Sequence, residues 1–202
     1  MNRRVAVTSL SISAALVAAI GVNEGWTERP VIPVKGDVPT IYNGITWNAE
    51  TGKRITMQDD SWTLCNMGDS KACGVRMLTA HLVRTDDGLK NCVKPTAQMT
   101  QGEWDILHDF AHQYGVPATC KSSIVRNYNA AKYEAACHSY LKYKFVDGYD
   151  CSTAGNKHCY GVWTRQLDRF DKCMNEVRNA DMRDGAVHAR QWASQIESEN
   201  VV

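Results

Sequence analysis

The sequence has almost no excess of charge of either sign. Its 23 Lys and Arg residues are balanced by 22 Asp and Glu residues, giving a formal net charge of +1 over 202 residues. Proteins that bind nucleic acid through its phosphates usually carry a basic face or stripe. We therefore expect no nucleic-acid partner. The length fits one ordinary domain with small appendages.

The sequence also has no Cys-x-x-Cys pair, although it contains eight cysteines. Closely spaced pairs are typical of structural zinc sites, whereas an even number of dispersed cysteines is typical of exported proteins with disulfides. We therefore expect disulfides rather than zinc. Cys65 with Cys73, and Cys151 with Cys159, are close enough to close local loops, and the other four cysteines would join helices.

Charge is absent from residues 5–22, directly after Arg3 and Arg4. Such a run fits either a signal peptide or a short membrane helix. It is rich in Ala and Ser, and its eight Val, Leu and Ile residues contribute only about −2.4 to −4.8 kcal/mol to insertion. We expect a segment that enters a membrane but is held there weakly, with its N-terminus in the cytoplasm.

The rest of the chain predicts an α+β fold. Proline and glycine residues between short apolar pieces favour a small β-hairpin sheet from about Val31 to Ile55. From about Ser70 the apolar residues recur at helical steps, and this set contains Val75, Leu78, Leu82 and Leu89. A small N-terminal sheet would thus precede a mainly helical C-terminal lobe.

Later helices have clearer boundaries. Thr100 and Glu103 have the spacing of a capping box, and Gly115 would end that helix. Further helical patterns cover residues 122–143 and 161–198, the second with an expected break near Gly185.

One predicted helix carries Asp105, His108, Asp109 and His112 at three- and four-residue steps. This set could in principle hold a metal ion. Apolar residues alternate with it, however, and spacing alone is weak evidence. A helix whose histidines have protein partners is the better interpretation, and we expect no metal.

Two carboxylates and a threonine follow the uncharged run: Glu24, Asp37 and Thr40. Glycoside hydrolysis needs one protonated and one ionised carboxyl group on either side of the scissile bond. The alternative is that Glu24 only marks the end of the apolar run and that Asp37 lies in an ordinary Gly-Asp turn. Spacing alone favours this alternative.

The order Glu24-Gly25, then about a dozen residues, then GDVPTIYNGIT resembles the phage lysozyme family of muramidases, glycoside hydrolase family 24. Members carry Glu-Gly at the end of the first helix and a later PTIGYGxT motif. The likeness continues in WDILHDFAHQYG, which resembles the family's core helix, and in a final block that contains Arg165. It covers roughly residues 23–173 and implies a lysozyme-like fold.

The resemblance implies that Glu24 is the general acid and that Thr40 holds the attacking water. The second carboxylate should lie between them. The family's usual spacing leads to Pro33, which has no carboxylate. Asp37 is the only carboxylate between Glu28 and Thr40, so it is assigned this role. Glu28 is the other candidate, but it would lie one turn beyond Glu24 if the helix continued, and so would not face it across a cleft.

Three further site residues follow from the resemblance. Tyr42 and Asn43 stand where the family has Gly and Tyr, and Arg165-Gln166 stands where it has paired arginines. The resemblance implies that Tyr42 and Asn43 contact substrate at the floor of the cleft, and that Arg165 is a structural or substrate-facing residue. The resemblance implies no cofactor.

Taken together, these features predict an endolysin similar to signal-arrest-release endolysins. Residues 1–22 would be a membrane segment, 23–174 the catalytic domain and 175–202 a helical extension. The protein would be exported to the periplasm of a Gram-negative host, tethered at first to the inner membrane through residues 5–22. There it would act as a monomer on peptidoglycan, cleaving the β-1,4 bond between N-acetylmuramic acid and N-acetylglucosamine. No cysteine precedes Cys65, so disulfide exchange with the released segment is not expected.

Two other classes of function compete with this prediction. The altered TIYNG motif is compatible with a non-catalytic peptidoglycan-binding protein on the same scaffold. A secreted, disulfide-rich interaction protein would explain the cysteines but not the downstream matches.

Overall fold

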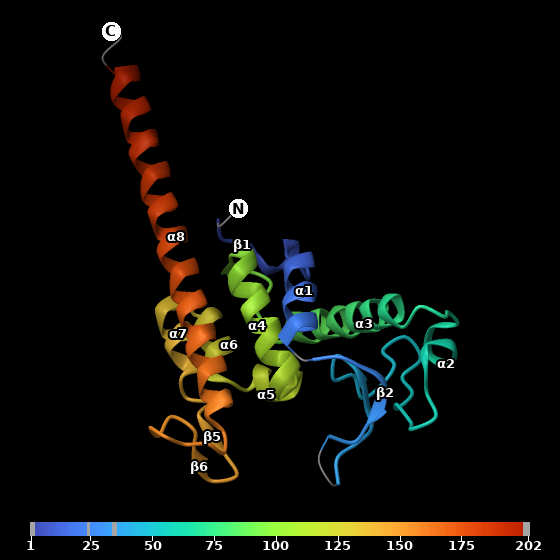
Figure 1. The fold of residues 1–202 in the computed structure, drawn as a ribbon. Coiled ribbons are helices and arrows are strands. Elements are labelled where there is room, and N and C mark those ends of the chain that lie inside the picture. Colours follow the sequence, from blue (N-terminus) through green and yellow to red (C-terminus); the bar gives the residue numbers. More distant parts are fainter. Residues whose placement is uncertain (1–2, 24, 34–35, 200–202) are drawn as a thin grey trace. The chain divides into compact units, whose positions relative to one another are not determined.

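The structure, a computed structural model, describes residues 3–23, 25–33 and 36–199 (Figure 1). The chain forms two compact units, each built from more than one stretch of sequence. Unit 1 comprises Met1–Leu10, Lys90–Leu107 and Pro117–Val202, and unit 2 comprises Ser11–Leu89 and His108–Val116.

Unit 2 contains the predicted small sheet. Its elements are α1 (Ala14–Asn23), β2 (Thr27–Val31), β3 (Thr40–Tyr42), α2 (Ser61–Cys65) and most of α3 (Ser70–Lys90). The antiparallel β2–β3 pair begins at Thr27, four residues earlier than predicted, and isolated bridges continue it as far as Arg54. The expected β-hairpin region is thus confirmed, with an earlier start.

The core of unit 2 includes part of the uncharged run. Leu16 and Ile20 of α1 are buried with Ile41 and Leu78. Val75 departs from the predicted apolar stripe, because it is 57% exposed. Its angular position around α3 is only about 20° from that of Leu82, so helical phase does not explain its exposure.

Unit 1 is mainly helical. It contains β1 (Val5–Ala6), a 3₁₀ turn η1 (Val7–Ser9), β4 (Gln98–Met99), the start of α4 (Gln101–Tyr114), the end of α5 (Val116–Cys120), α6 (Ser123–Tyr128), α7 (Tyr133–Tyr140), β5 (Phe145–Val146), β6 (Tyr149–Asp150) and α8 (Tyr160–Glu199). Helix α7 packs against both α6 and α8 (Figure 1). The fold is α+β, as the sequence predicts.

Residues 5–10 are an integral part of unit 1. Strand β1 pairs with β4, and the backbone nitrogen of Val7 donates to the carbonyl of Ala97. Val7 and Leu10 are buried, and the Lys90 ammonium group donates to the Leu10 carbonyl at 2.7 Å. The uncharged run therefore supplies core residues to both units. Among the described residues, no helix is both long and apolar enough to cross a membrane.

The predicted capping box is confirmed. The Thr100 hydroxyl accepts from the Glu103 backbone nitrogen at 3.0 Å, and the Glu103 carboxylate accepts from the Thr100 nitrogen at 2.8 Å. The break expected near Gly185 is wrong, because α8 continues through it. A single glycine costs a helix only about 1 kcal/mol, which the flanking helix-forming residues can absorb.

All eight cysteines form disulfides, and the two predicted local pairs are confirmed. Cys92–Cys120 ties the turn after α3 to the end of α5. Cys137–Cys173 joins α7 to α8. Closing these loops restricts the unfolded chain, which stabilises the folded state by roughly 2–4 kcal/mol per bond.

Candidate active site

The predicted general acid, Glu24, lies outside the described residues, but the chain on both sides of it is held by Asn43. The Asn43 side-chain nitrogen donates to the carbonyl of Gly21 at 2.9 Å and to the carbonyl of Gly25 at 2.7 Å. Asn43 itself is buried. One amide group thus links the end of α1 to the first residue after position 24.

Trp26 also fixes the chain after Gly25. The Trp26 ring stacks on Tyr42, with centroids 5.0 Å apart and planes 27° apart. It also lies directly over Gly74 of α3, where a Cβ atom would come within 2.5 Å of the indole. Gly25 has a φ of +71°, the left-handed conformation that glycine adopts without strain and that commonly ends helices. The chain therefore turns sharply from α1 into β2.

This turn changes the position expected for Glu28. The residue does not continue α1 by a turn; it lies exposed in β2. Asp37 is also exposed, in the connection between β2 and β3, directly after Gly36 with its φ of +96°. Helical geometry therefore gives no reason to reject Glu28 as the second carboxylate.

Thr40 begins β3 and pairs with Val31 of β2. It is partly exposed, and its hydroxyl makes only a long contact of 3.4 Å with the Val31 carbonyl. A hydroxyl held this loosely can reorient towards a water molecule. In unit 2, Asn43 is thus brought together with Gly21 and Gly25, and Thr40 lies three residues before it in the adjoining strand.

Tyr42 and Asn43 are both almost fully buried, at 1% and 5% exposure. Asn43 forms hydrogen bonds with backbone carbonyls, and the Tyr42 ring stacks against the Trp26 ring. Burial, together with the negative charges of Asp60 and Glu28, raises the pKa of the Tyr42 hydroxyl. The structure gives these residues supporting roles, and the substrate contacts implied by the resemblance stay a prediction.

Arg165 belongs to α8 in unit 1, where it is partly buried. Its neighbour Gln166, the departure from the family's paired arginines, is fully buried and accepts a hydrogen bond from Arg169 at 3.2 Å. Arg169 lies one helical turn later and is itself buried. The family's second arginine position is therefore part of the interior of this unit.

The sequence did not reveal a buried charge cluster around Arg4. The Arg4 guanidinium donates to Glu103 at 3.1 Å and to Asp181 at 3.0 Å, and it lies 3.6 Å above the ring of Tyr133. Burial raises the pKa of Glu103, while hydrogen bonds from Thr100 and Arg4 lower it. The capping-box pattern identified Glu103, but Arg4 looked like the charged flank of a membrane segment.

The histidines on α4 have protein partners, as predicted. His108 is fully buried, and its Nε2 lies 3.2 Å from a carboxylate oxygen of Asp86 on α3. His112 packs edge-on against His81. Within the described part of the chain, no three His, Cys, Asp or Glu side chains are grouped as metal ligands would be.

Comparison with solved structures identifies a lysozyme fold. An endolysin from Escherichia coli O157:H7 phage FAHEc1 matches at 18% identity with a TM-score of 0.62, over 82% of this chain and 94% of that one. A mutant of P22 lysozyme matches at 17% identity and a TM-score of 0.60, over 82% and 99%. The muramidase domain of SpmX from Asticaccaulis excentricus matches at 19% and 0.58, over 81% and 97%.

The sequence itself gives the family. No curated protein sequence matches the chain. The family model for phage lysozyme, however, matches residues 22–165, which include the turn after α1, the small sheet and the start of α8. The chain belongs to the phage lysozyme family and is a lysozyme-type glycoside hydrolase.

Proposed function

We propose that the protein is an endolysin, a muramidase that hydrolyses the β-1,4 bond between N-acetylmuramic acid and N-acetylglucosamine in bacterial peptidoglycan. The observation that carries the proposal is that the described residues on both sides of position 24, Gly21 and Gly25, are fixed by the same side chain. The family match covers residues 22–165; Asn43 binds the Gly21 and Gly25 carbonyls, and Trp26 stacks on Tyr42 directly after Gly25. An acid catalyst must be held in this way to meet a scissile bond reproducibly.

The proposed reaction uses three residues. Glu24 donates its proton to the glycosidic oxygen as the bond to C1 of the muramic acid breaks. A water molecule held by the Thr40 hydroxyl attacks C1 from the opposite face, and Asp37 takes its proton or stabilises the positive charge on the sugar. The chemistry needs no cofactor.

Asp37 keeps the role of second carboxylate because it precedes Thr40 by only three residues and is exposed in the connection that leads into β3. Glu28 is exposed in β2, the strand that pairs with β3, and so remains the rival. Asp37→Asn and Glu28→Gln should be compared in one assay. Loss of activity in the Glu28 variant alone would reverse the assignment.

The bond specificity is tested by digesting purified peptidoglycan, reducing the products with borohydride and analysing them by mass spectrometry. A muramidase yields products that end in reduced muramic acid. Products ending in reduced glucosamine, or in anhydromuramic acid, would contradict the proposal. Absence of any released saccharide would favour the non-catalytic peptidoglycan-binding alternative.

The proposal includes an earlier, membrane-tethered stage in the inner membrane of a Gram-negative host, through residues 5–22. Four disulfides are consistent with export to an oxidising compartment. In the folded protein Val7 belongs to unit 1, while Leu16 and Ile20 belong to the core of unit 2. Residues 5–22 cannot make these contacts while they are inserted in the membrane. A tethered molecule would therefore lack core residues in both units. Release would then complete the fold as a monomer.

Exposed alanines of α1 provide a test of this stage. Ala15 and Ala19 are exposed in the folded protein, so replacing both with Leu strengthens membrane insertion without disturbing packing. The Leu variant should stay longer in the membrane fraction and lyse the host later than a matched Ser variant, while both purified enzymes keep equal activity. Equal lysis times, or a mature protein that lacks residues 1–19, would contradict the tether.

A further inference from the structure

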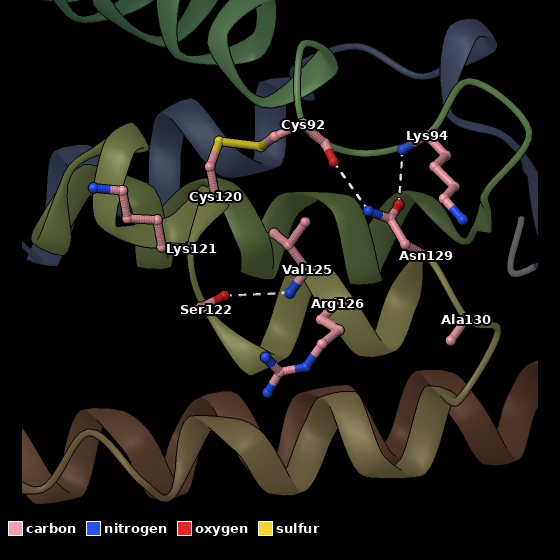
Figure 2. A pocket seen from close by; sticks show the side chains of 9 residues that line it. All are labelled: Cys92, Lys94, Cys120, Lys121, Ser122, Val125, Arg126, Asn129 and Ala130. Atoms are coloured by element: carbon pink, nitrogen blue, oxygen red, sulfur yellow. Dashed lines mark hydrogen bonds between the residues drawn. A yellow bond between two sulfur atoms is a disulfide. The ribbon is translucent and has the colours of Figure 1, made fainter.

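Unit 1 contains a hollow that the lysozyme chemistry does not use. It lies between the turn after α3 and the α5–α6 region, and its volume is about 480 Å³. Pockets for small molecules commonly span roughly 300–1,000 Å³. Its lining residues are Cys92, Lys94, Cys120, Lys121, Ser122, Val125, Arg126, Asn129 and Ala130 (Figure 2).

The walls of this hollow are fixed. The Cys92–Cys120 disulfide links its two sides covalently. Asn129 links them again, because its amide donates to the Cys92 carbonyl at 3.0 Å and accepts from the Lys94 nitrogen at 2.7 Å (Figure 2). The Ser122 hydroxyl accepts from the Val125 nitrogen at 3.2 Å. A ligand would therefore meet a preformed surface and need to order little of the protein.

The charge around the hollow is of one sign. Lys94, Lys121 and Arg126 line it, and no acidic residue does. The sequence has no Asp or Glu in residues 88–102 or 113–133, the two stretches that form it, although the whole chain is almost neutral. Among the described residues, none forms an ion pair with these three side chains. Arg76, Lys144 and Lys172, by contrast, each contact a carboxylate.

The three cations surround the hollow and do not converge on one point. Figure 2 shows Lys121 and Lys94 at opposite ends, with Arg126 below them. A phosphate group presents oxygens in several directions and carries up to two charges, whereas a carboxylate presents two oxygens in one plane. Arginine and lysine are the usual phosphate-binding side chains. The size of the hollow leaves room for more than the phosphate itself.

We propose that this hollow binds a phosphate-bearing ligand of about the size of glycerol phosphate, with Arg126 contacting the phosphate oxygens and Lys94 and Lys121, at the two ends, adding to the positive potential of the hollow. The same chemistry occurs in a free phosphorylated metabolite and in the headgroup of an anionic phospholipid. The proposal is independent of catalysis by unit 2.

The test uses the full-length protein with glycerol 1-phosphate, monitored by calorimetric titration at constant ionic strength so that general screening does not vary. Saturable one-to-one binding is expected. Arg126→Gln should weaken it by about tenfold or more, since charge-assisted hydrogen bonds are lost. Lys94→Gln should weaken it less, because lysine acts as a single point charge.

Lys157→Gln is the matched control, because Lys157 is an exposed lysine of unit 1 away from the hollow. It removes one charge and should leave affinity unchanged. Equal weakening by Lys157→Gln and Arg126→Gln would overturn the proposal.

A second experiment, with lipid vesicles, distinguishes the two possible sources of the phosphate group. Co-sedimentation with phosphatidylglycerol vesicles, but not with phosphatidylcholine vesicles, that is lost in Arg126→Gln supports a lipid headgroup. Binding of glycerol 1-phosphate without vesicle binding supports a free phosphorylated ligand. Binding to neither probe contradicts the site.

Discussion

The side-chain nitrogen of Asn43 lies 2.7 Å from the carbonyl oxygen of Gly25, and the same nitrogen reaches Gly21 on the other side of position 24. A single buried amide thereby binds the backbone on both sides of position 24. Asn43→Ala should lower the free energy of unfolding by about 1–3 kcal/mol, because two hydrogen bonds to backbone carbonyls are lost. It should also lower kcat sharply, since the backbone on both sides of the proposed acid loses these hydrogen bonds.

Asn48 offers the matched control for that variant. It is a buried asparagine of the same unit, and it holds the backbone of Glu50, Thr51 and Leu64 by similar bonds. Asn48→Ala should cost comparable stability in urea unfolding but leave kcat of the folded enzyme nearly unchanged. Equal kcat losses in the two variants would mean that Asn43 acts only through general stability.

Gly74 on α3 is predicted to be irreplaceable, although alanine normally stabilises a helix interior by about 1 kcal/mol relative to glycine. A Cβ atom here would meet the Trp26 ring at 2.5 Å and Tyr42 at 3.2 Å. Gly74→Ala should therefore lower Tm and shift tryptophan fluorescence as Trp26 leaves its stack. Gly21→Ala, where nothing lies within 4 Å, should not lower Tm. An unchanged Tm and emission spectrum in Gly74→Ala would refute the packing role of Trp26.

The buried pair of Arg4 and Glu103 should be strongly coupled, because their side chains are only 7% and 0% exposed. Arg4→Gln leaves a buried carboxylate without its cation, and such changes cost about 3–5 kcal/mol. Loss of Arg4 also removes a hydrogen bond and a charge interaction that lower the pKa of Glu103. The double variant Arg4→Gln/Glu103→Gln should lose clearly less than the sum of the single losses in a urea-unfolding cycle. Strict additivity would contradict the pair.

His81 should make the protein acid-sensitive. Burial, and the nearby charge of His112, lower the pKa of His81 from 6.5 to about 4. The unfolded chain thus binds more protons than the folded one between these values, so the free energy of unfolding falls as the pH falls from about 6.5 to about 4, by up to about 3 kcal/mol. His81→Gln should flatten the dependence, whereas His158→Gln, at an exposed site, should not. A wild-type protein with no loss of stability in this window would contradict the account.

The features that the sequence predicts well are local or follow from the family pattern. The capping box of Thr100 and Glu103 depends on residues three apart, and the local disulfides close loops of separation 8. The fold class follows from the order of sheet and helices together with the family motifs. Such features need no knowledge of how distant segments pack.

The features that the sequence does not predict depend on long-range packing. Arg4 and Glu103 are 99 residues apart, and nothing in either neighbourhood identifies the other. Asn43 differs from the family motif. Its hydrogen bonds to Gly21 and Gly25 form only when the chain after β3 lies beside the end of α1. Helix α8 runs through Gly185 because one glycine is a weak signal beside the helix formers around it.

The central claim is that Glu24 is the general acid of a muramidase. The most direct measurement is the rate at which Glu24→Gln releases reducing ends from purified peptidoglycan, with Tm recorded on the same preparation. General acid catalysis contributes about 10²–10⁴-fold, so the rate should fall by at least about 10²-fold while Tm stays at the wild-type value. A folded Glu24→Gln protein that retains most of its rate would contradict the account.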